Sequence, residues 1–193
     1  MSKAAELLLS PRGRTLVAMI ALVALARLLP HPPNFAPAES MALFAGALFV
    51  DRRLALLVPL AAMALSDIGL AVLFGAGYGF HALLPVVYAC IAGTVLLGFL
   101  LRGRIGVASV AAASIASAVG FFLVTNFAVW WGSSFYPQDG AGLLACYVAA
   151  LPFLKNAIAG ALFYSLLLFG GWAMLTRRWP ALAGAATPRL SSR

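Results

Sequence analysis

Charged side chains are scarce in this sequence. Of its 193 residues only 9% are charged, while 64% are hydrophobic, and a soluble domain carries about 25% charged residues. A soluble fold must cover itself with polar side chains, so this composition excludes an ordinary water-soluble globular protein. The sequence therefore predicts an integral membrane protein of the all-α class.

Motifs of soluble enzymes are also missing. The sequence has no Walker A loop, no dinucleotide-binding fingerprint, and neither an HExxH nor a GxSxG motif. Its two cysteines, Cys90 and Cys146, lack the spacing of a zinc or redox motif. A disulfide between them is one alternative that the sequence leaves open. The usual expectation is that a free cysteine in apolar sequence packs as a small hydrophobic residue. The net charge of +8 indicates membrane topology and anionic lipid headgroups rather than a nucleic-acid partner.

Long uncharged runs are abundant. They cover 15–26, 54–66, 82–101, 105–131 and 157–176. The second run continues past Asp67 to Phe74, which gives about the 20 residues that a transmembrane helix needs. The apolar stretch 40–50 is shorter, so it is either a tilted span or a re-entrant segment. With it, the sequence predicts a bundle of six transmembrane helices that forms a single membrane domain over 1–193.

Proline and glycine predict where these helices end. Loops are expected at 30–37, 75–79 and 132–140, because proline lacks an amide donor and glycine favours turns. The apolar stretch 141–152 is too short to span. Pro59, Pro85 and Pro152 should kink their helices.

Basic residues predict the orientation. With six spans and a cytoplasmic N-terminus, 11 of the 13 bases lie on the cytoplasmic side, as the positive-inside rule requires. They are Lys3, Arg12, Arg14, Arg52, Arg53, Arg102, Arg104, Arg177, Arg178, Arg189 and Arg193. Both tails, 1–14 and 177–193, are thus expected on the cytoplasmic side of a bacterial inner membrane. A signal peptide ending near Ala26 is the competing interpretation, but it would leave an odd number of spans and misplace later Arg-rich loops.

The remaining polar and aromatic residues gather on the predicted outer side. They are Arg27, His31, Asn34, Glu39, Tyr78, His81, Asn126, Trp130, Trp131, Tyr136, Asp139, Lys155 and Asn156. An aromatic belt at the membrane surface accounts for the two tryptophans. It does not account for Asp67, which is expected about 10 Å inside the outer helix end. An acid at that depth faces a cavity or a partner, so Asp67 either serves function or pairs with Arg27 or Lys155.

Cys90 is expected at a similar depth. It follows His81 by nine residues, which places it about 13 Å below the outer surface. A packed thiol is the plain interpretation. A thiolate at the floor of a pocket would instead suit a soft metal centre such as the cobalt of a corrinoid, with His81 as a weaker candidate ligand.

Several short motifs resemble those of a known family. They are PPNFAP at 32–37, ALFAGA at 42–47, Pro59 to Asp67, NFAVW at 126–130, Tyr136 with Pro137, Gly142 with Leu143, and Pro152 to Asn156. Over roughly residues 27–170 the chain is similar to small bacterial membrane proteins related to the substrate-binding S-components of energy-coupling-factor vitamin transporters. This resemblance implies six helices and an outward-opening vitamin pocket, which the loop after the first helix covers.

The resemblance also implies a ligand and site residues. Solitary cobalamin-specific members use a membrane cysteine to bind the corrinoid cobalt and to assist removal of its cyanide ligand, a role that would come to Cys90, with Cys146 as the rival. Cobalamin is then a transported ligand, with no intrinsic cofactor. The binding residues expected around it are Asn34, Phe35, Asp67, Tyr88, Asn126, Trp130, Trp131, Tyr136 and Asn156.

The first helix departs from the family pattern. S-components commonly carry Ala-x-x-x-Ala there to dock the coupling subunit, whereas Ala18, Ala21, Ala24 and Ala26 are never four apart. Either docking uses another small-residue face or the protein acts without an ATP-driven module. Such a face recurs every four residues at Ala108, Ala112, Ala116 and Gly120, which favours close helix packing.

Three functions remain open from the sequence. The first is vitamin uptake, for cobalamin or another vitamin. The second is a membrane-embedded enzyme that acts on a lipid-borne or vitamin-like substrate, with Asp67 and His81 as acid and base. The third is a structural or assembly subunit that binds no small molecule.

Overall fold

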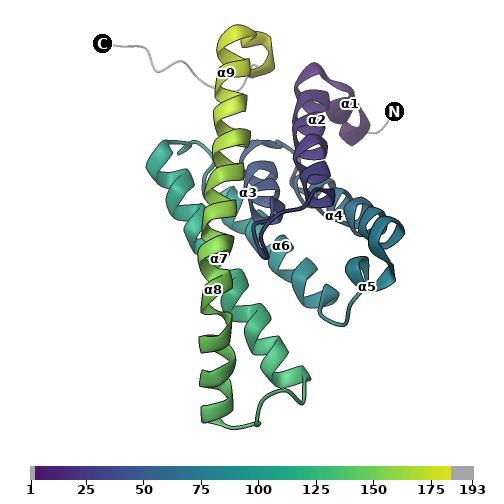
Figure 1. The fold of residues 1–193 in the computed structure, drawn as a ribbon. Coiled ribbons are helices and arrows are strands. Elements are labelled where there is room, and N and C mark those ends of the chain that lie inside the picture. Colours follow the sequence, from purple (N-terminus) through teal and green to yellow (C-terminus); the bar gives the residue numbers. More distant parts are fainter. Residues whose placement is uncertain (1–2, 184–193) are drawn as a thin grey trace.

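The computed structural model describes residues 3–183, which contain helices and loops and no β-strand. In chain order the elements are α1 (Lys3–Leu9), α2 (Pro11–Leu25), η1 (Ala26–Leu28), α3 (Ala38–Leu48), α4 (Arg52–Phe74), α5 (Ala76–Gly79), α6 (Leu84–Phe99), α7 (Val107–Gly132), α8 (Gly140–Ser165), η2 (Leu166–Gly170), α9 (Gly171–Arg178) and η3 (Pro180–Ala183). Figure 1 shows the helices as one bundle around α3. The predicted all-α class is therefore confirmed.

Four segments are long and apolar enough to cross a membrane. They are Arg52–Phe74, Ala76–Phe99, Val107–Gly132 and Gly140–Arg178. A fifth arises if Lys3–Leu9 and Pro11–Leu28, which are bent by 71°, count as one broken span. With 11 residues, α3 is only about 16 Å long, whereas the hydrocarbon core of a bilayer is about 30 Å thick. The structure thus contains four or five helices of spanning length rather than six.

The last helix is longer than the sequence suggested. The stretch 141–152 was expected to be a separate short piece, but Gly140–Arg178 is a continuous helical segment in which η2 is a π-helical turn. Pro152 lies inside α8 without ending it. Proline removes only one backbone hydrogen bond, and the contact between α8 and α7 holds the helix on both sides of it.

Helix α3 lies at the centre of the bundle. All of its residues are buried, and it packs against α6, α4 and α8. Its backbone meets that of α6 closely, since a Cβ atom on Gly98 would lie 2.6 Å from the carbonyl oxygen of Leu43, and one on Gly46 would lie 2.3 Å from that of Val95. A half-length apolar helix is stable here because protein, not lipid, surrounds it.

Two arginines cap the C-terminal end of α3. Arg12 donates to the carbonyl oxygen of Leu48 at 2.9 Å, and Arg102 donates to those of Gly46 at 2.9 Å and Phe49 at 2.7 Å. The last carbonyls of a helix lack backbone partners and attract cations. Burial, and then the charge of Arg52, lower the pKa of Arg102 from its usual value. These two arginines therefore stabilise the fold by satisfying the last carbonyl oxygens of α3.

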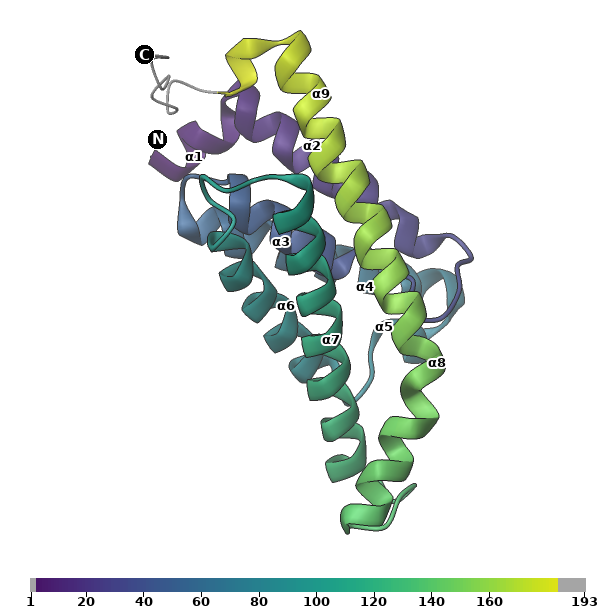
Figure 2. The same ribbon diagram turned by 90° about the vertical axis from the view of Figure 1, so that its left-hand side faces the viewer.

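The predicted cytoplasmic bases gather at one end of the molecule, here called the basic end. In Figures 1 and 2 this end carries α1, the α3–α4 and α6–α7 connections and the end of α9. The two ends of the described chain meet there, since Arg12 donates to the carbonyl oxygens of Leu182 at 3.2 Å and Ala183 at 2.7 Å. Arg189 and Arg193 lie outside the described residues. At the opposite, distal end, the α7–α8 hairpin extends beyond the α2–α3 and α4–α5 connections (Figure 2).

The small-residue stripe of α7 does not pack inside the bundle. Ala108, Ala112 and Ala116 are exposed, and a Cβ atom on Gly120 would meet nothing within 4 Å. The close helix packing expected along this stripe is therefore not formed within the described bundle. The buried face of α7 instead contains Val110, Ala113, Ser114, Ser117, Ala118 and Phe122, and Ser114 on it forms a hydrogen bond with Ser165 of α8.

Candidate functional site

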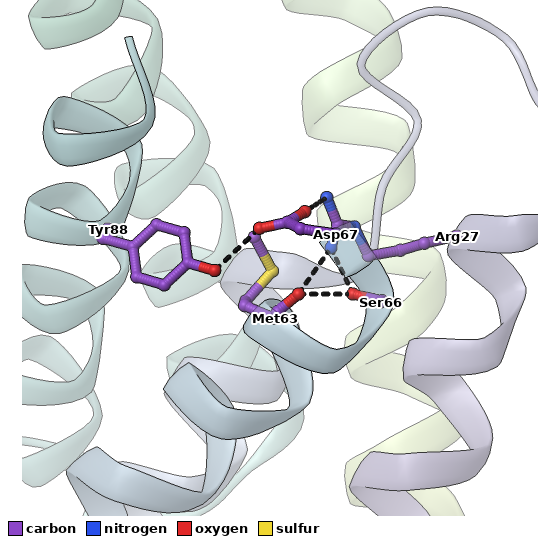
Figure 3. A network of polar contacts seen from close by, with 5 residues as sticks. All are labelled: Arg27, Met63, Ser66, Asp67 and Tyr88. Carbon is purple, nitrogen blue, oxygen red and sulfur yellow. Dashed lines mark hydrogen bonds and ion pairs between the residues drawn. The ribbon is translucent and has the colours of Figure 1, made fainter. Parts of the chain in front are cut away.

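An ion pair lies inside the bundle where α2 ends. The turn η1 places Arg27 against α4, and its Nη2 atom lies 2.7 Å from Oδ1 of Asp67. The side chains are 14% and 3% exposed, respectively. Of the two partners expected for Asp67, the structure selects Arg27, while Lys155 is exposed on α8. Figure 3 shows the pair and its neighbours.

The second terminal nitrogen of Arg27 is fixed by α4. Nη1 donates to the carbonyl oxygen of Met63 at 3.3 Å and to the hydroxyl of Ser66. The Ser66 hydroxyl in turn donates to the same Met63 carbonyl at 2.8 Å. A buried charge is costly unless it is paired and hydrogen-bonded, and this guanidinium meets both conditions.

Tyr88 links the ion pair to α6. Its hydroxyl donates to Oδ2 of Asp67 at 2.7 Å (Figure 3). Both carboxylate oxygens of Asp67 are thus engaged, one by Arg27 and the other by Tyr88. We call Arg27, Ser66, Asp67 and Tyr88 the charged cluster. It joins three elements that are far apart in the sequence, and two of its members, Asp67 and Tyr88, were expected site residues.

Glu39 is a third ionisable group beside this cluster. It lies in the first turn of α3 and is 6% exposed, within electrostatic range of Arg27 and Cys90. The sequence placed Glu39 among the outer polar residues and did not single it out. The signal that could have identified it is its position as an acidic residue at the start of an otherwise apolar segment. With Arg27 and Asp67, it places one basic and two acidic side chains in this part of the bundle.

The two cysteines occupy different environments. Both are free thiols. Cys90 is half-buried on α6, two residues after Tyr88, and faces a groove of about 370 Å³ between α6 and α7. The groove is also lined by Gly93, Thr94, Ser117, Gly120 and Phe121. Cys146 is only 2% exposed, with its Sγ 3.5 Å from the carbonyl oxygen of Asn126. Cys90 is therefore the more accessible thiol.

The loop between η1 and α3 is fastened to α8. Asn156 donates to the carbonyl oxygen of Pro33 at 3.1 Å, and the ring of Phe35 lies 5.6 Å from those of Phe163 and Tyr164. Asn34 is exposed, with a positive φ of 62° that asparagine tolerates. Phe35 and Asn156, both expected to contact the ligand, thus hold this loop in place.

Four further expected residues lie in the α7–α8 hairpin. The indole of Trp130 donates to the carbonyl oxygen of Pro137 at 2.9 Å, and Trp131 is 70% exposed. Asn126 donates within its own helix, to the carbonyl oxygen of Phe122 at 2.8 Å. Tyr136 is half-buried in the connecting loop. The Trp130–Pro137 bond ties the end of α7 to the connecting loop.

His81 stands apart from the other candidate ligands. It is exposed in the α5–α6 connection, and among the described residues no three His, Cys, Asp or Glu side chains are grouped so that they could hold a metal ion. A metal carried by the ligand itself needs only one protein donor. Of the two free thiols, Cys90 is the one that faces a groove, the one between α6 and α7.

Comparisons with known proteins place the chain at the level of a family. No curated protein and no solved structure matches its sequence. A family model, DUF6580, described as a family of unknown function, matches residues 8–182 and so spans α2 to α9. The chain therefore belongs to the DUF6580 family of unknown function.

Proposed function

We propose that this protein is an S-component-like vitamin-binding protein of the bacterial inner membrane, with cobalamin as its ligand. We assign the six helices of such a protein to α2, α3, α4, α6, α7 and the long α8–α9 segment. In this proposal α3 fills the place of the second helix as a buried half-length helix. Both termini are cytoplasmic, and the distal end faces outward.

The observation that carries the proposal is the setting of Cys90. A free, half-buried thiol opens onto a groove between α6 and α7, on the helix that also carries Tyr88. Thiolates are suitable ligands for soft and borderline metals. In cyanocobalamin, the Cys90 sulfur would replace cyanide on cobalt, and the thiol proton would leave with the cyanide as hydrogen cyanide. The cobalt oxidation state does not change in this exchange.

The loop after the first helix is a second feature that the proposal uses, although none of its residues lines the groove at Cys90. In S-components this loop covers the pocket, and here residues 33–35 are tied to α8 through Asn156 and Phe35. The exposed stripe of α7, at Ala108, Ala112 and Ala116, leaves a face for a coupling subunit. Without such a module the protein acts as a solitary transporter.

The enzyme alternative gains no support from the geometry. Both oxygens of Asp67 are bound by Arg27 and Tyr88, so this carboxylate is held as an acceptor rather than poised as an acid. His81 is exposed and belongs to a different part of the chain.

Two cysteine variants form a matched test. The full chain in mild detergent is mixed with aquocobalamin, and the absorption spectrum is recorded for the native protein, Cys90→Ser and Cys146→Ser. We expect a thiolate-shifted corrinoid spectrum in the native protein and in Cys146→Ser, and an unshifted one in Cys90→Ser. Failure of the native protein to retain any corrinoid would refute cobalamin as the ligand. An equal shift in Cys90→Ser would refute the role of this thiol alone.

A further inference from the structure

A second groove lies at the basic end, away from the charged cluster. It has a volume of about 470 Å³ and runs between the start of α7 and the segment from α8 to α9. One wall is formed by Val107, Val110 and Ala111, and the other by Leu166, Phe169 and Ala173. The π-helical turn Leu166–Gly170 lies along this second wall. The groove is therefore long, apolar and bounded by two helices.

The floor of the groove carries hydroxyl groups that are already hydrogen-bonded. Ser114 donates to Ser165 at 2.8 Å, Ser165 donates to Ser40 at 3.2 Å, and Ser40 donates to the carbonyl oxygen of Ala161 at 2.8 Å. All three serines are buried. The three serine hydroxyls thus form hydrogen bonds with one another and with a backbone carbonyl, so they need no polar group from a ligand. A hydrocarbon chain can occupy the groove without leaving a hydroxyl unpaired.

The mouth of the groove is positive. Arg177, in the last turn of α9, lines it, and its side chain makes no hydrogen bond or ion pair with any residue of 3–183. The N-terminal end of α7, at Gly106 and Val107, lies at the same groove, so the positive pole of a 26-residue helix adds to the field. An apolar groove with a positively charged mouth is complementary to a molecule that has a hydrocarbon tail and an anionic headgroup.

We propose that this groove binds an anionic phospholipid, with one acyl chain between α7 and α8 and the phosphate at Arg177. A partner helix fits this groove less well than an acyl chain. A helix with its side chains is about 10–12 Å wide, and the two helices that bound the groove, α7 and α8, already pack against each other. Guanidinium groups bind phosphate oxygens through paired hydrogen bonds. The site is independent of the vitamin-binding proposal.

Adjacent arginines offer a matched test of the headgroup. Arg177 lines the groove, whereas Arg178 follows it on the same helix and does not. Native mass spectrometry of the full chain in detergent, titrated with phosphatidylglycerol or phosphatidylcholine, measures the bound lipid. We expect phosphatidylglycerol to be preferred, with about a fivefold loss of its adduct in Arg177→Gln and little loss in Arg178→Gln. Equal losses in the two variants, or equal binding of both lipids, would overturn the proposal.

The acyl chain is tested by filling the groove. Ala111→Trp places an indole on its wall, and Ala112→Trp places one on the exposed side of α7, outside the groove. The lipid adduct should disappear in the first variant and persist in the second. An adduct that survives Ala111→Trp would contradict an acyl chain as the occupant. So would a dimer of the native protein that Ala111→Trp dissociates, because the groove would then hold a second copy of the chain. If Ala111→Trp fails to fold, the arginine pair still decides.

Discussion

Asp67 shows how a single buried charge is stabilised within an apolar bundle. Its depth in an apolar helix indicated a partner from the sequence alone, and two bases were available. The short turn η1 decides between them, because it brings Arg27 to within 2.7 Å of the carboxylate. The pair is closed by Tyr88, so neither oxygen of Asp67 is left without a donor.

We expect Asp67→Asn to destabilise the protein strongly. Arg27 is 14% exposed and would lose its counter-charge, and breaking a buried ion pair from one side costs about 3–5 kcal/mol. Unfolding in detergent, followed by circular dichroism, measures the loss. The control is Lys155→Gln, an exposed base on α8 that should change little. If Arg27→Gln and Asp67→Asn were strictly additive in the double variant, the coupling between them would be disproved.

Tyr88→Phe should have a smaller effect of the same sign. It removes one hydrogen bond to a charged acceptor while keeping the ring, and such bonds contribute about 1.5–3 kcal/mol. The Asp67→Asn background provides the check, because Tyr88→Phe should cost less there. An equal cost in both backgrounds would mean that the ring, not the hydroxyl, supplies the stability.

At the scale of elements, the contact between α3 and α6 depends on absent side chains. Gly98→Ala should lower the unfolding temperature and the yield, because its Cβ atom would lie 2.6 Å from a backbone oxygen that cannot rotate away. Gly93 lies on the same helix, and a Cβ atom there would meet nothing within 4 Å. Gly93→Ala should be neutral or slightly stabilising, by up to about 1 kcal/mol from helix propensity. Equal melting temperatures for the two variants would show that the close approach is not needed.

The capping of α3 can be tested with a second pair. Arg102→Gln removes the charged donors to Gly46 and Phe49 and should cost about 1–3 kcal/mol in unfolding experiments. Arg104 lies in the same connection but is exposed, so Arg104→Gln should cost far less. Similar losses would assign the effect to net charge instead of to the cap.

Helices α3 and α8 mark the limits of prediction from local sequence. Composition and loop residues indicated where helices lie and that the stretch 40–50 is short, but not that α3 is buried at the centre or that α8 is continuous. The surrounding helices bury α3 completely, and α8 continues through Pro152 while packing against α7. Neither neighbour can be identified from the segment itself.

At the scale of the whole molecule, both described chain ends lie at the basic end, with the α7–α8 hairpin opposite (Figure 2). Single cysteines placed at Arg53 and Phe135 in a Cys90→Ser, Cys146→Ser background test the orientation. We expect a membrane-impermeant maleimide to label position 135 in cells with a permeable outer membrane and an intact inner one. Position 53 should react only after lysis. The reverse pattern would overturn the predicted topology.

The sequence by itself determined that the chain is apolar and suited to a membrane, that it is all-α, and that its bases cluster at one end. These properties follow from composition and hydrophobic periodicity, which are local. It also indicated Asp67 as a buried charge. Only the tertiary structure decided that Arg27 and Tyr88 bind it, that α3 is a central half-length helix, and that the alanine stripe of α7 faces outward. Those features depend on which surfaces pack together. The hydrophobic periodicity of one segment does not identify the distant segment that it contacts.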